Sequence, residues 1–260
     1  FSVSRYNSTG IIQWMLNSAW PGMYWQLFDS YLVPNGAFYG AKKANKSVHI
    51  LYRYGFNDVW IVNEKFKKLD NLTSRIRVFN FNSDLVLDKH LKLNICENQT
   101  KLVYENLPKP ENGSSIYFVD LRLFNSSGKE IDNNFYLLST SPEILDYKAT
   151  KWFYTPVKKY ADFTDLDRIP KTEIEIKKEF YSDDGKHKIR VSLENKTQRI
   201  AFFIRMKLMD RETGNMVVPI YWDDNCISLL PGEKRTVRGF YETEKELDKL
   251  KLTVSGINIF

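Results

Sequence analysis

Apolar and polar residues alternate with a period of two over most of the chain, as they do in β-strands that bury one face. Between residues 48 and 148, short segments with this pattern are separated by Gly, Asn, Asp, Ser and Pro. Seven such strands in about 100 residues predict an immunoglobulin-like β-sandwich. The expected strands cover residues 48–52, 59–62, 76–79, 91–93, 102–104, 116–123 and 135–138.

A second series of short alternating segments predicts a second sandwich. The triplet Asp183-Asp184-Gly185 is a hairpin signal between its first two strands. The apolar run at 200–204 predicts a central strand that is covered on both faces. The expected strands cover residues 173–176, 188–191, 200–208, 217–220, 227–229, 236–240 and 252–254.

The two series are joined by residues 142–170, which are rich in aromatic residues and Pro. This composition predicts an ordered connector between domains rather than a disordered linker. Its aromatic side chains are expected to be buried against another part of the protein. They are Trp152, Phe153, Tyr154 and Tyr160.

The first 47 residues follow a different pattern. The apolar run at 11–16 predicts a buried strand, residues 17–22 form a polar and aromatic loop, and 37–47 have helix-forming composition. Three of the six Trp residues lie between residues 9 and 43. A strand that leads into an aromatic loop is a place where sugar sites are often built.

The chemistry of the loop fits a sugar. An indole covers the C–H face of a pyranose ring, and Trp14, Trp20 and Trp25 each supply one. The amides of Gln13 and Asn17 donate and accept hydrogen bonds, as the sugar hydroxyls require. Residue type alone leaves open a second interpretation, in which the Trp residues only fill a core.

Charge and composition exclude several classes of function. The net charge of +6 is spread over interleaved basic and acidic residues, so no basic stripe predicts a nucleic-acid partner. No apolar run approaches the roughly 18 residues of a membrane span, and no membrane partner is expected. Cys96 and Cys226 are expected to be unpaired thiols. The three His residues, His49, His90 and His187, are isolated, so neither a metal site nor a cofactor is expected.

Other polar residues have simple structural interpretations. Isolated glutamates such as Glu64 and Glu173 are interpreted as surface charges. The acidic group Asp223-Asp224-Asn225 is interpreted as a turn rather than a calcium site. Seven Asn-X-Ser/Thr sequons, Asn195 among them, mark glycosylation only if the host glycosylates secreted proteins.

Several long aromatic motifs resemble a known family. The motifs at 14–21, 25–32 and 38–44 look like the end of the catalytic barrel in glycoside hydrolase family 2, specifically its exo-β-D-glucosaminidase branch. Further motifs are similar to the two C-terminal domains of the same branch, and the resemblance spans almost the whole chain. These lie at 152–156, 160–163, 219–225 and 229–233.

The resemblance implies a mainly β chain in which two immunoglobulin-like β-sandwiches follow a strand-helix remnant of a (β/α)₈ barrel. The remnant is expected at 1–47, the first sandwich at 48–148, and the second, with the aromatic connector, at 149–260. A complete barrel needs about 250 residues. The opening residues lack an initiator Met and a signal peptide. We therefore expect a C-terminal fragment of a longer protein. Separately, we expect that parent protein to be exported, to the periplasm or outside the cell.

The resemblance also implies the chemistry of that parent protein. Retaining glycosidases use two carboxylic residues, about 5 Å apart, across the scissile bond. In family members both precede the segment that matches this chain, so no catalytic residue is assigned and the fragment is expected to be inactive. The parent is expected to act on an oligosaccharide. Two alternatives remain: a β-mannosidase of the same family, or a non-catalytic carbohydrate-binding or structural sandwich module.

Three residues are the leading candidates for binding the parent's sugar. Trp14, Asn17 and Trp20 follow the expected barrel strand, and loops in that position face the active site. Trp222 and Asp223 are further cleft candidates, because the last domain of family members can lean over the barrel mouth.

The expected strand at 11–16 also has a consequence for association. Without neighbouring barrel strands it is an unpaired edge, which invites contact with another chain. We expect residues 1 to about 40 either to pack against the first sandwich or to mediate self-association.

Overall fold

A computed structural model describes residues 2–4, 7–8, 10–22, 25–111, 113–183, 186–242 and 247–260 of the 260-residue chain. The chain divides into two compact units. Unit 1 comprises residues 1–10 and 46–169, and unit 2 comprises residues 11–45 and 170–260. Among the described helices, none has the length and apolar character needed to cross a membrane.

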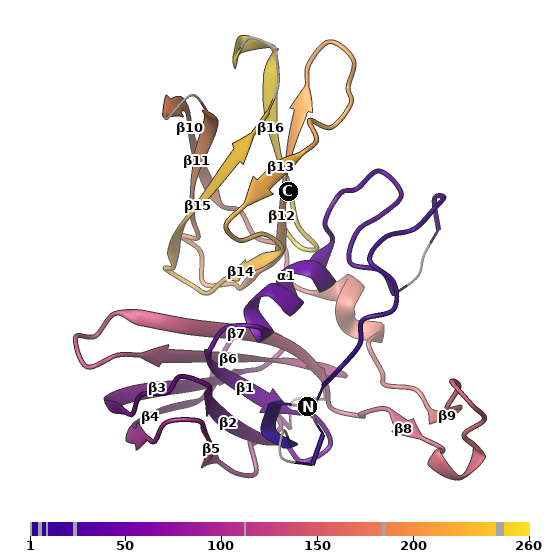
Figure 1. Ribbon diagram of the computed structural model, residues 1–260, viewed down its shortest axis with the longest axis vertical. Coiled ribbons are helices and arrows are strands. Elements are labelled where there is room, and N and C mark those ends of the chain that lie inside the picture. Colours follow the sequence, from indigo (N-terminus) through magenta and orange to yellow (C-terminus); the bar gives the residue numbers. More distant parts are fainter. Residues whose placement is uncertain are drawn as a thin grey trace. The chain divides into compact units, whose positions relative to one another are not determined.

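Unit 1 is a sandwich of two antiparallel sheets (Figure 1). One sheet has the order β1-β2-β5, formed by Val48–Arg53, Asp58–Asn63 and Gln99–Tyr104. The other has the order β4-β3-β6-β7, formed by Leu85–Ile95, Leu69–Phe79, Ile116–Phe124 and Glu130–Ser139. A short helical turn, η1, covers Ser2–Ser4. All seven strands expected between residues 48 and 148 are present, and several are longer than expected.

The period of two places the core of unit 1 between these sheets. In β3, Ile76 and Val78 are fully buried, whereas Arg75 and Arg77 between and beside them are partly exposed. Across the ladder, Val119 pairs with Val78 and Leu121 with Ile76, and both are fully buried. The alternation seen in the sequence therefore selects the buried face of each strand.

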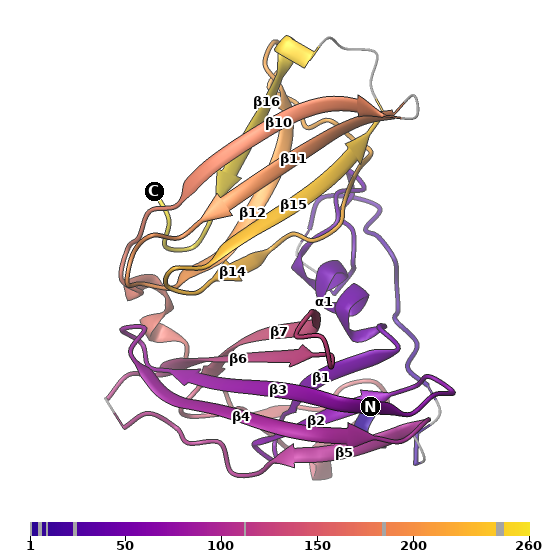
Figure 2. The ribbon, with the colours of Figure 1, turned by 90° about the vertical axis from the view of Figure 1, so that its left-hand side faces the viewer.

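Unit 2 contains the second sandwich, whose larger sheet is well seen in Figure 2. That sheet has the order β10-β11-β15-β13, formed by Glu175–Asp183, Lys186–Glu194, Lys234–Tyr241 and Ile220–Trp222. The smaller sheet has the order β14-β12-β16, formed by Ile227–Leu229, Ala201–Asp210 and Leu250–Ser255. The turn η4, Leu247–Lys249, leads into β16.

The predicted strands of unit 2 all overlap observed ones. Strands β10 and β11 pair up to Asp183 and Lys186, while Asp184 and Gly185 of the expected hairpin turn lie outside the described residues. The expected doubly covered strand is central but irregular, because a bulge falls between Ala201 and Ile204. Within it, Phe203 has a positive φ of 54° and remains 38% exposed.

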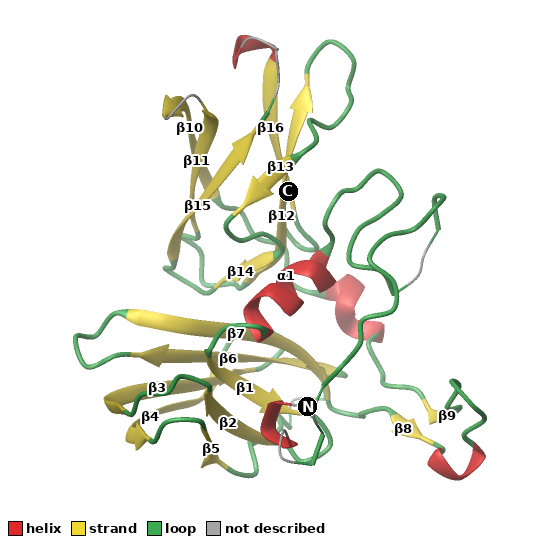
Figure 3. Cartoon of the chain, viewed as in Figure 1, coloured by secondary structure: helices red, strands yellow, loops and turns green. Residues whose placement is uncertain are grey.

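The connector is ordered, as expected, but its aromatic residues are not buried. It forms the two-stranded hairpin of β8, Ile144–Leu145, and β9, Val157–Lys159, with the turns η2, Tyr147–Ala149, and η3, Thr164–Arg168 (Figure 3). Asp165 ties its end to unit 1, since its carboxylate accepts hydrogen bonds from Ser115 N at 2.6 Å and Ser114 Oγ at 3.0 Å. The hairpin itself projects with its aromatic side chains exposed.

Buried Asn side chains replace missing strand partners in unit 2. Asn258 accepts from Phe202 N at 2.8 Å and donates to the carbonyls of Pro170 and Ile200, both at 2.8 Å. Asn195 is fully buried and donates to the carbonyls of Arg199, Leu229 and Leu230. Each side chain satisfies backbone groups that no ladder reaches.

The burial of Asn195 gives a prediction about its sequon. The two N–H groups on the Nδ2 atom that would carry a glycan are already shared among three backbone carbonyls, at 2.7, 3.1 and 3.2 Å. In a host that glycosylates secreted proteins, we expect folded protein to carry no glycan at Asn195, whereas the exposed sequon at Asn98 is open to modification. Peptide mass spectrometry of the secreted protein tests this; a high glycan occupancy at Asn195 would contradict the burial.

Residues 11–45 contain the expected helix but not the expected strand. Helix α1 spans Gly36–Ala44 and is capped by Asn35, whose side chain accepts from Ala37 N and Phe38 N. Residues 11–16 run without strand pairing, and Ile11 and Ile12 are 72% and 88% exposed. A strand needs a neighbour for its N–H and C=O groups, and no described strand lies beside this segment. The segment belongs to unit 2, so the first expected alternative, packing on the first sandwich, is not seen for residues 11–16. The second alternative, self-association, stays a prediction.

Candidate functional site

The loop that carries the candidate sugar ligands is held by short-range hydrogen bonds. The Leu16 carbonyl accepts from Leu27 N at 3.1 Å and Phe28 N at 3.0 Å. Asp29 closes the next turn, where its carboxylate accepts from the backbone N–H groups of Tyr31 and Val33, both at 2.9 Å. The loop is therefore ordered although it contains no long strand.

Two of the three predicted sugar ligands present their rings to solvent. Trp14 is 70% exposed and Trp20 is 73% exposed. Asn17 is half-buried, and its Nδ2 donates to the Ser18 carbonyl at 3.3 Å. Among the described residues, none donates a hydrogen bond to its Oδ1, which can act as an acceptor. Trp25, which is 52% exposed, lies beside them, since its carbonyl accepts from Gln13 Nε2 at 3.0 Å. Exposed Trp rings on an ordered loop fit binding better than core filling.

Helix α1 fastens this loop to the second sandwich. Lys42 Nζ donates to the carbonyls of Trp222 and Asp223, at 3.1 and 2.9 Å. Lys43 forms an ion pair with Asp224 at 3.0 Å. Both Lys residues lie in the last turn of α1, where cations also interact favourably with the helix dipole.

Tyr39 attaches α1 to the second sandwich through hydrophobic contacts. Its side chain is 3% exposed and belongs to the core cluster of unit 2. Burial raises the pKa of Tyr39 to about 12, and a hydrogen bond with Asn225 acts in the opposite direction. Asn225 in turn bonds both backbone groups of Met206, each at 2.9 Å. The helix is thus part of the fold of unit 2.

The two further cleft candidates have different surroundings. Trp222 is 4% exposed, and its ring lies against β15, because a Cβ added at Gly239 would fall 2.8 Å from Trp222 Cε3. Asp223 is exposed and extends the pairing of β13 with β15 by one residue. Its N donates to the Arg238 carbonyl, and its carboxylate accepts from Arg238 N. Trp222 is built into the core, and Asp223 holds a turn.

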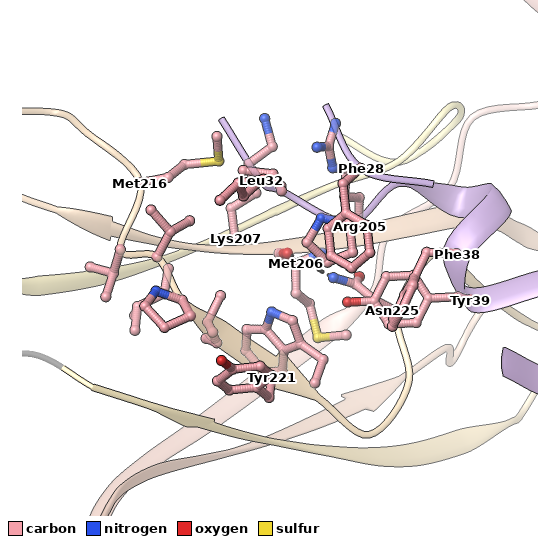
Figure 4. Close-up of a pocket in the computed structure, with 18 of the residues that line it drawn as sticks. Phe28, Leu32, Phe38, Tyr39, Arg205, Met206, Lys207, Met216, Tyr221 and Asn225 are labelled. Atoms are coloured by element: carbon pink, nitrogen blue, oxygen red, sulfur yellow. Dashed lines mark hydrogen bonds between the residues drawn. The ribbon is translucent and has the colours of Figure 1, made fainter. Parts of the chain in front are cut away.

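A cavity of about 550 Å³ lies within unit 2, between the loop and the second sandwich (Figure 4). Asn17 and Trp222 contribute to its lining, whereas Trp14, Trp20 and Asp223 do not. Its walls are mostly apolar, and three cationic residues join them, Arg205 and Lys207 from β12 and Lys42 from α1. Apolar residues on both sides include Phe28, Leu32, Phe38, Met216, Val217 and Pro219.

Sequence reasoning missed this cavity and the attachment of α1. The cavity arises where residues 16–42 meet residues 205–225, which are far apart in the chain. The adjacent cations Lys42 and Lys43 at the end of the predicted helix were a signal of a docked helix terminus. Across the described ranges, no three His, Cys, Asp or Glu side chains gather closely enough to hold a metal ion.

Two protein families match separate parts of the chain. Residues 57–141 match the mannosidase Ig/CBM-like domain, and residues 152–259 match the exo-beta-D-glucosaminidase Ig-fold domain. The chain is 33% identical to an exo-beta-D-glucosaminidase of Amycolatopsis orientalis, over 99% of this chain and 25% of the relative. It is 35% identical to an exo-beta-D-glucosaminidase of Streptomyces avermitilis, over 91% of this chain and 26% of the relative.

A solved structure extends the match to three dimensions. The crystal structure of the exo-chitosanase CsxA of Amycolatopsis orientalis superposes with a TM-score of 0.87, at 32% identity, over 97% of this chain and 30% of that chain. Over nearly its whole length, the chain resembles the exo-β-D-glucosaminidase-like branch of glycoside hydrolase family 2. It matches only the C-terminal part of these relatives and spans about a quarter of the length of the two curated ones. The resemblance predicted from the aromatic motifs is confirmed.

Proposed function

We propose that this chain is the C-terminal accessory part of a longer retaining glycosidase that resembles the exo-β-D-glucosaminidases. The two sandwiches act as its scaffold, and the catalytic carboxylates come from residues outside this chain. The observation that carries the proposal is the ordered loop of unit 2, which holds exposed Trp residues and is fastened to the sandwich by α1. This arrangement supports a rigid presentation of aromatic rings toward a substrate.

Within the site, each residue has a distinct proposed role. Trp20 forms part of the sugar subsite wall through its ring face, and Trp14 supplies a second apolar surface. Asn17 accepts a hydrogen bond from a sugar hydroxyl through Oδ1. Lys42, Lys43 and Tyr39 do not touch the sugar; they fix the position of the loop. Trp222 supports the sheet beneath them.

A β-mannosidase is the second candidate, because the domain that matches residues 57–141 is described as mannosidase Ig/CBM-like. The two activities differ in the contacts to the C2 substituent of the sugar. Hydrolysis of chromogenic β-glucosaminide and β-mannoside by the longer protein, beside this chain alone, decides between them. Activity of the chain alone would refute an accessory role.

The role of Trp20 gives a separate prediction. In the longer protein, Trp20→Ala is expected to lower kcat/KM by about tenfold, because one stacking surface contributes roughly 1–1.5 kcal/mol. Steady-state kinetics on the preferred glycoside measure this. Because Trp20 is 73% exposed, the unfolding transition of the chain should stay nearly unchanged.

Phe66→Ala is the matched control for Trp20→Ala. Phe66 is 95% exposed in unit 1, outside the proposed site, and its removal should leave the kinetics unaltered. Unchanged kinetics for Trp20→Ala would remove Trp20 from the subsite.

A further inference from the structure

The hairpin β8-β9 in unit 1 ends in two aromatic residues. Backbone hydrogen bonds link Lys151 and Tyr154 in both directions, each at 2.9 Å, so Trp152 and Phe153 form the two-residue tip. Thr150 Oγ1 and Thr155 Oγ1 lie 3.1 Å apart and add a side-chain bridge below the tip. The tip is therefore held in one shape and projects from the rest of the unit (Figure 1).

The tip presents its apolar surface at a conformational cost. Trp152 has a positive φ of 47°, in the left-handed region that L side chains rarely adopt. Its side chain is 93% exposed and that of Phe153 is 78% exposed, and the two rings contact each other edge to face, with centroids 4.6 Å apart. Within the part of the chain that the structure describes, no contact offsets this cost by burying the rings. Strain of this kind at an exposed aromatic tip marks an interaction surface.

The hairpin that carries the tip has a net positive charge. Residues 144–159 contain four Lys residues and one acidic residue, Asp146, which gives a net charge of +3. All four Lys residues are exposed, and within the described structure none of their ammonium groups has an ion pair or hydrogen bond. They are Lys148, Lys151, Lys158 and Lys159. A surface that accepts this tip must combine an apolar pocket with an acidic rim.

We propose that the tip docks into a pocket on the catalytic part of the same longer glycosidase. Trp152 and Phe153 enter an apolar pocket, and the four Lys residues of the hairpin face acidic residues at its rim. This inference rests on the proposed function. The matched Ig-fold domain begins at Trp152, and the curated relatives that share this segment are about four times as long as the chain. A tethered partner binds at a high effective concentration, so a small tip of two aromatic rings is sufficient.

The test follows the accessibility of Trp152 itself. The fluorescence of Trp152 is isolated by subtracting the signal of Trp152→Phe, and its quenching by acrylamide is compared in this chain and in the longer protein. We expect full access in the chain and protection in the longer protein. Phe153→Ala should raise the accessible fraction in the longer protein by about tenfold or more, as truncation of a hot-spot residue does.

Two matched controls separate the tip from general surface effects. Phe66→Ala removes an equally exposed ring of unit 1 and should leave the protection of Trp152 unchanged. The double variant Lys151→Glu with Lys158→Glu should abolish most of the protection, whereas Lys67→Glu, an exposed Lys beside Phe66, should not. If Lys67→Glu reduced the protection of Trp152 as much as the double variant does, the proposed acidic rim of the pocket would be refuted.

Three further outcomes overturn the inference, and two of them identify a different partner. Equal access of Trp152 in both proteins excludes docking. If Trp152 becomes protected from acrylamide in this chain alone as its concentration rises, the partner is a second copy of the chain. If the protection requires anionic phospholipid vesicles, the partner is a membrane. Glycosidase activity is assayed on the same samples: protection without activity refutes the proposed function and leaves the docking intact.

Discussion

Trp222→Ala is expected to destabilise unit 2 by about 3–5 kcal/mol, the usual cost of removing a buried large aromatic side chain. Trp222 is 4% exposed and belongs to the central core cluster of that unit. Its ring fills the space above Gly239, where an added Cβ would fall 2.8 Å from Trp222 Cε3, so its removal leaves a cavity in the core. Denaturant unfolding of the chain measures the loss, with unit 1 as an internal reference.

Tyr221→Ala is the matched control for Trp222→Ala. Tyr221 precedes Trp222 in β13 and points to the other face, where it is 50% exposed and stacks on Phe240 with ring centroids 4.6 Å apart. Its loss should cost only about 1 kcal/mol. Equal effects of the two changes would contradict the burial of Trp222. If the expected difference is found, any loss of activity in Trp222→Ala reports misfolding, and the role of Trp222 is to support the site.

Asp132→Ala is expected to destabilise unit 1 by about 3–5 kcal/mol, because it breaks a buried charged network. The fully buried carboxylate lies 2.9 Å from each of three nitrogen atoms: His49 Nδ1, Lys46 Nζ and Ile50 N. Its removal leaves the His49 ring and a backbone N–H buried without their acceptor. Thermal or denaturant unfolding measures the cost. Asp70→Ala, which removes an exposed ion pair with Lys68, is the control and should change stability little.

The same carboxylate predicts how stability depends on pH. Burial alone raises the pKa of Asp132, but the hydrogen bonds and charges of His49 and Lys46 and the bond from Ile50 N outweigh it, so the pKa lies below its ordinary value. A depressed folded-state pKa contributes stability above the unfolded-state pKa, near 4, and the contribution is lost as the pH falls through the folded-state value. The stability difference between wild type and Asp132→Asn should therefore shrink below about pH 4. A constant difference down to pH 2 would contradict this assignment.

The sequence by itself determined the architecture of both sandwiches and the helix. The period of two in a stretch such as 188–191 identifies a strand, because alternate side chains of a strand point to opposite faces. The aromatic motifs around Trp14 and Trp152 identified the family branch, since such long motifs are specific. Local signals of this kind need no knowledge of what the chain packs against.

Only the tertiary structure decided where residues 11–45 belong and which Trp residues are free. Trp222 and Trp152 look alike in sequence, yet one is 4% and the other 93% exposed, because exposure depends on contacts between distant segments. The apolar run at 11–16 has the composition of a strand but lies beside no described strand that could pair with it. Asn195 looks like a glycosylation site and instead replaces a missing strand partner. Strand pairing and side-chain burial depend on contacts between distant segments, so a local sequence pattern cannot determine them.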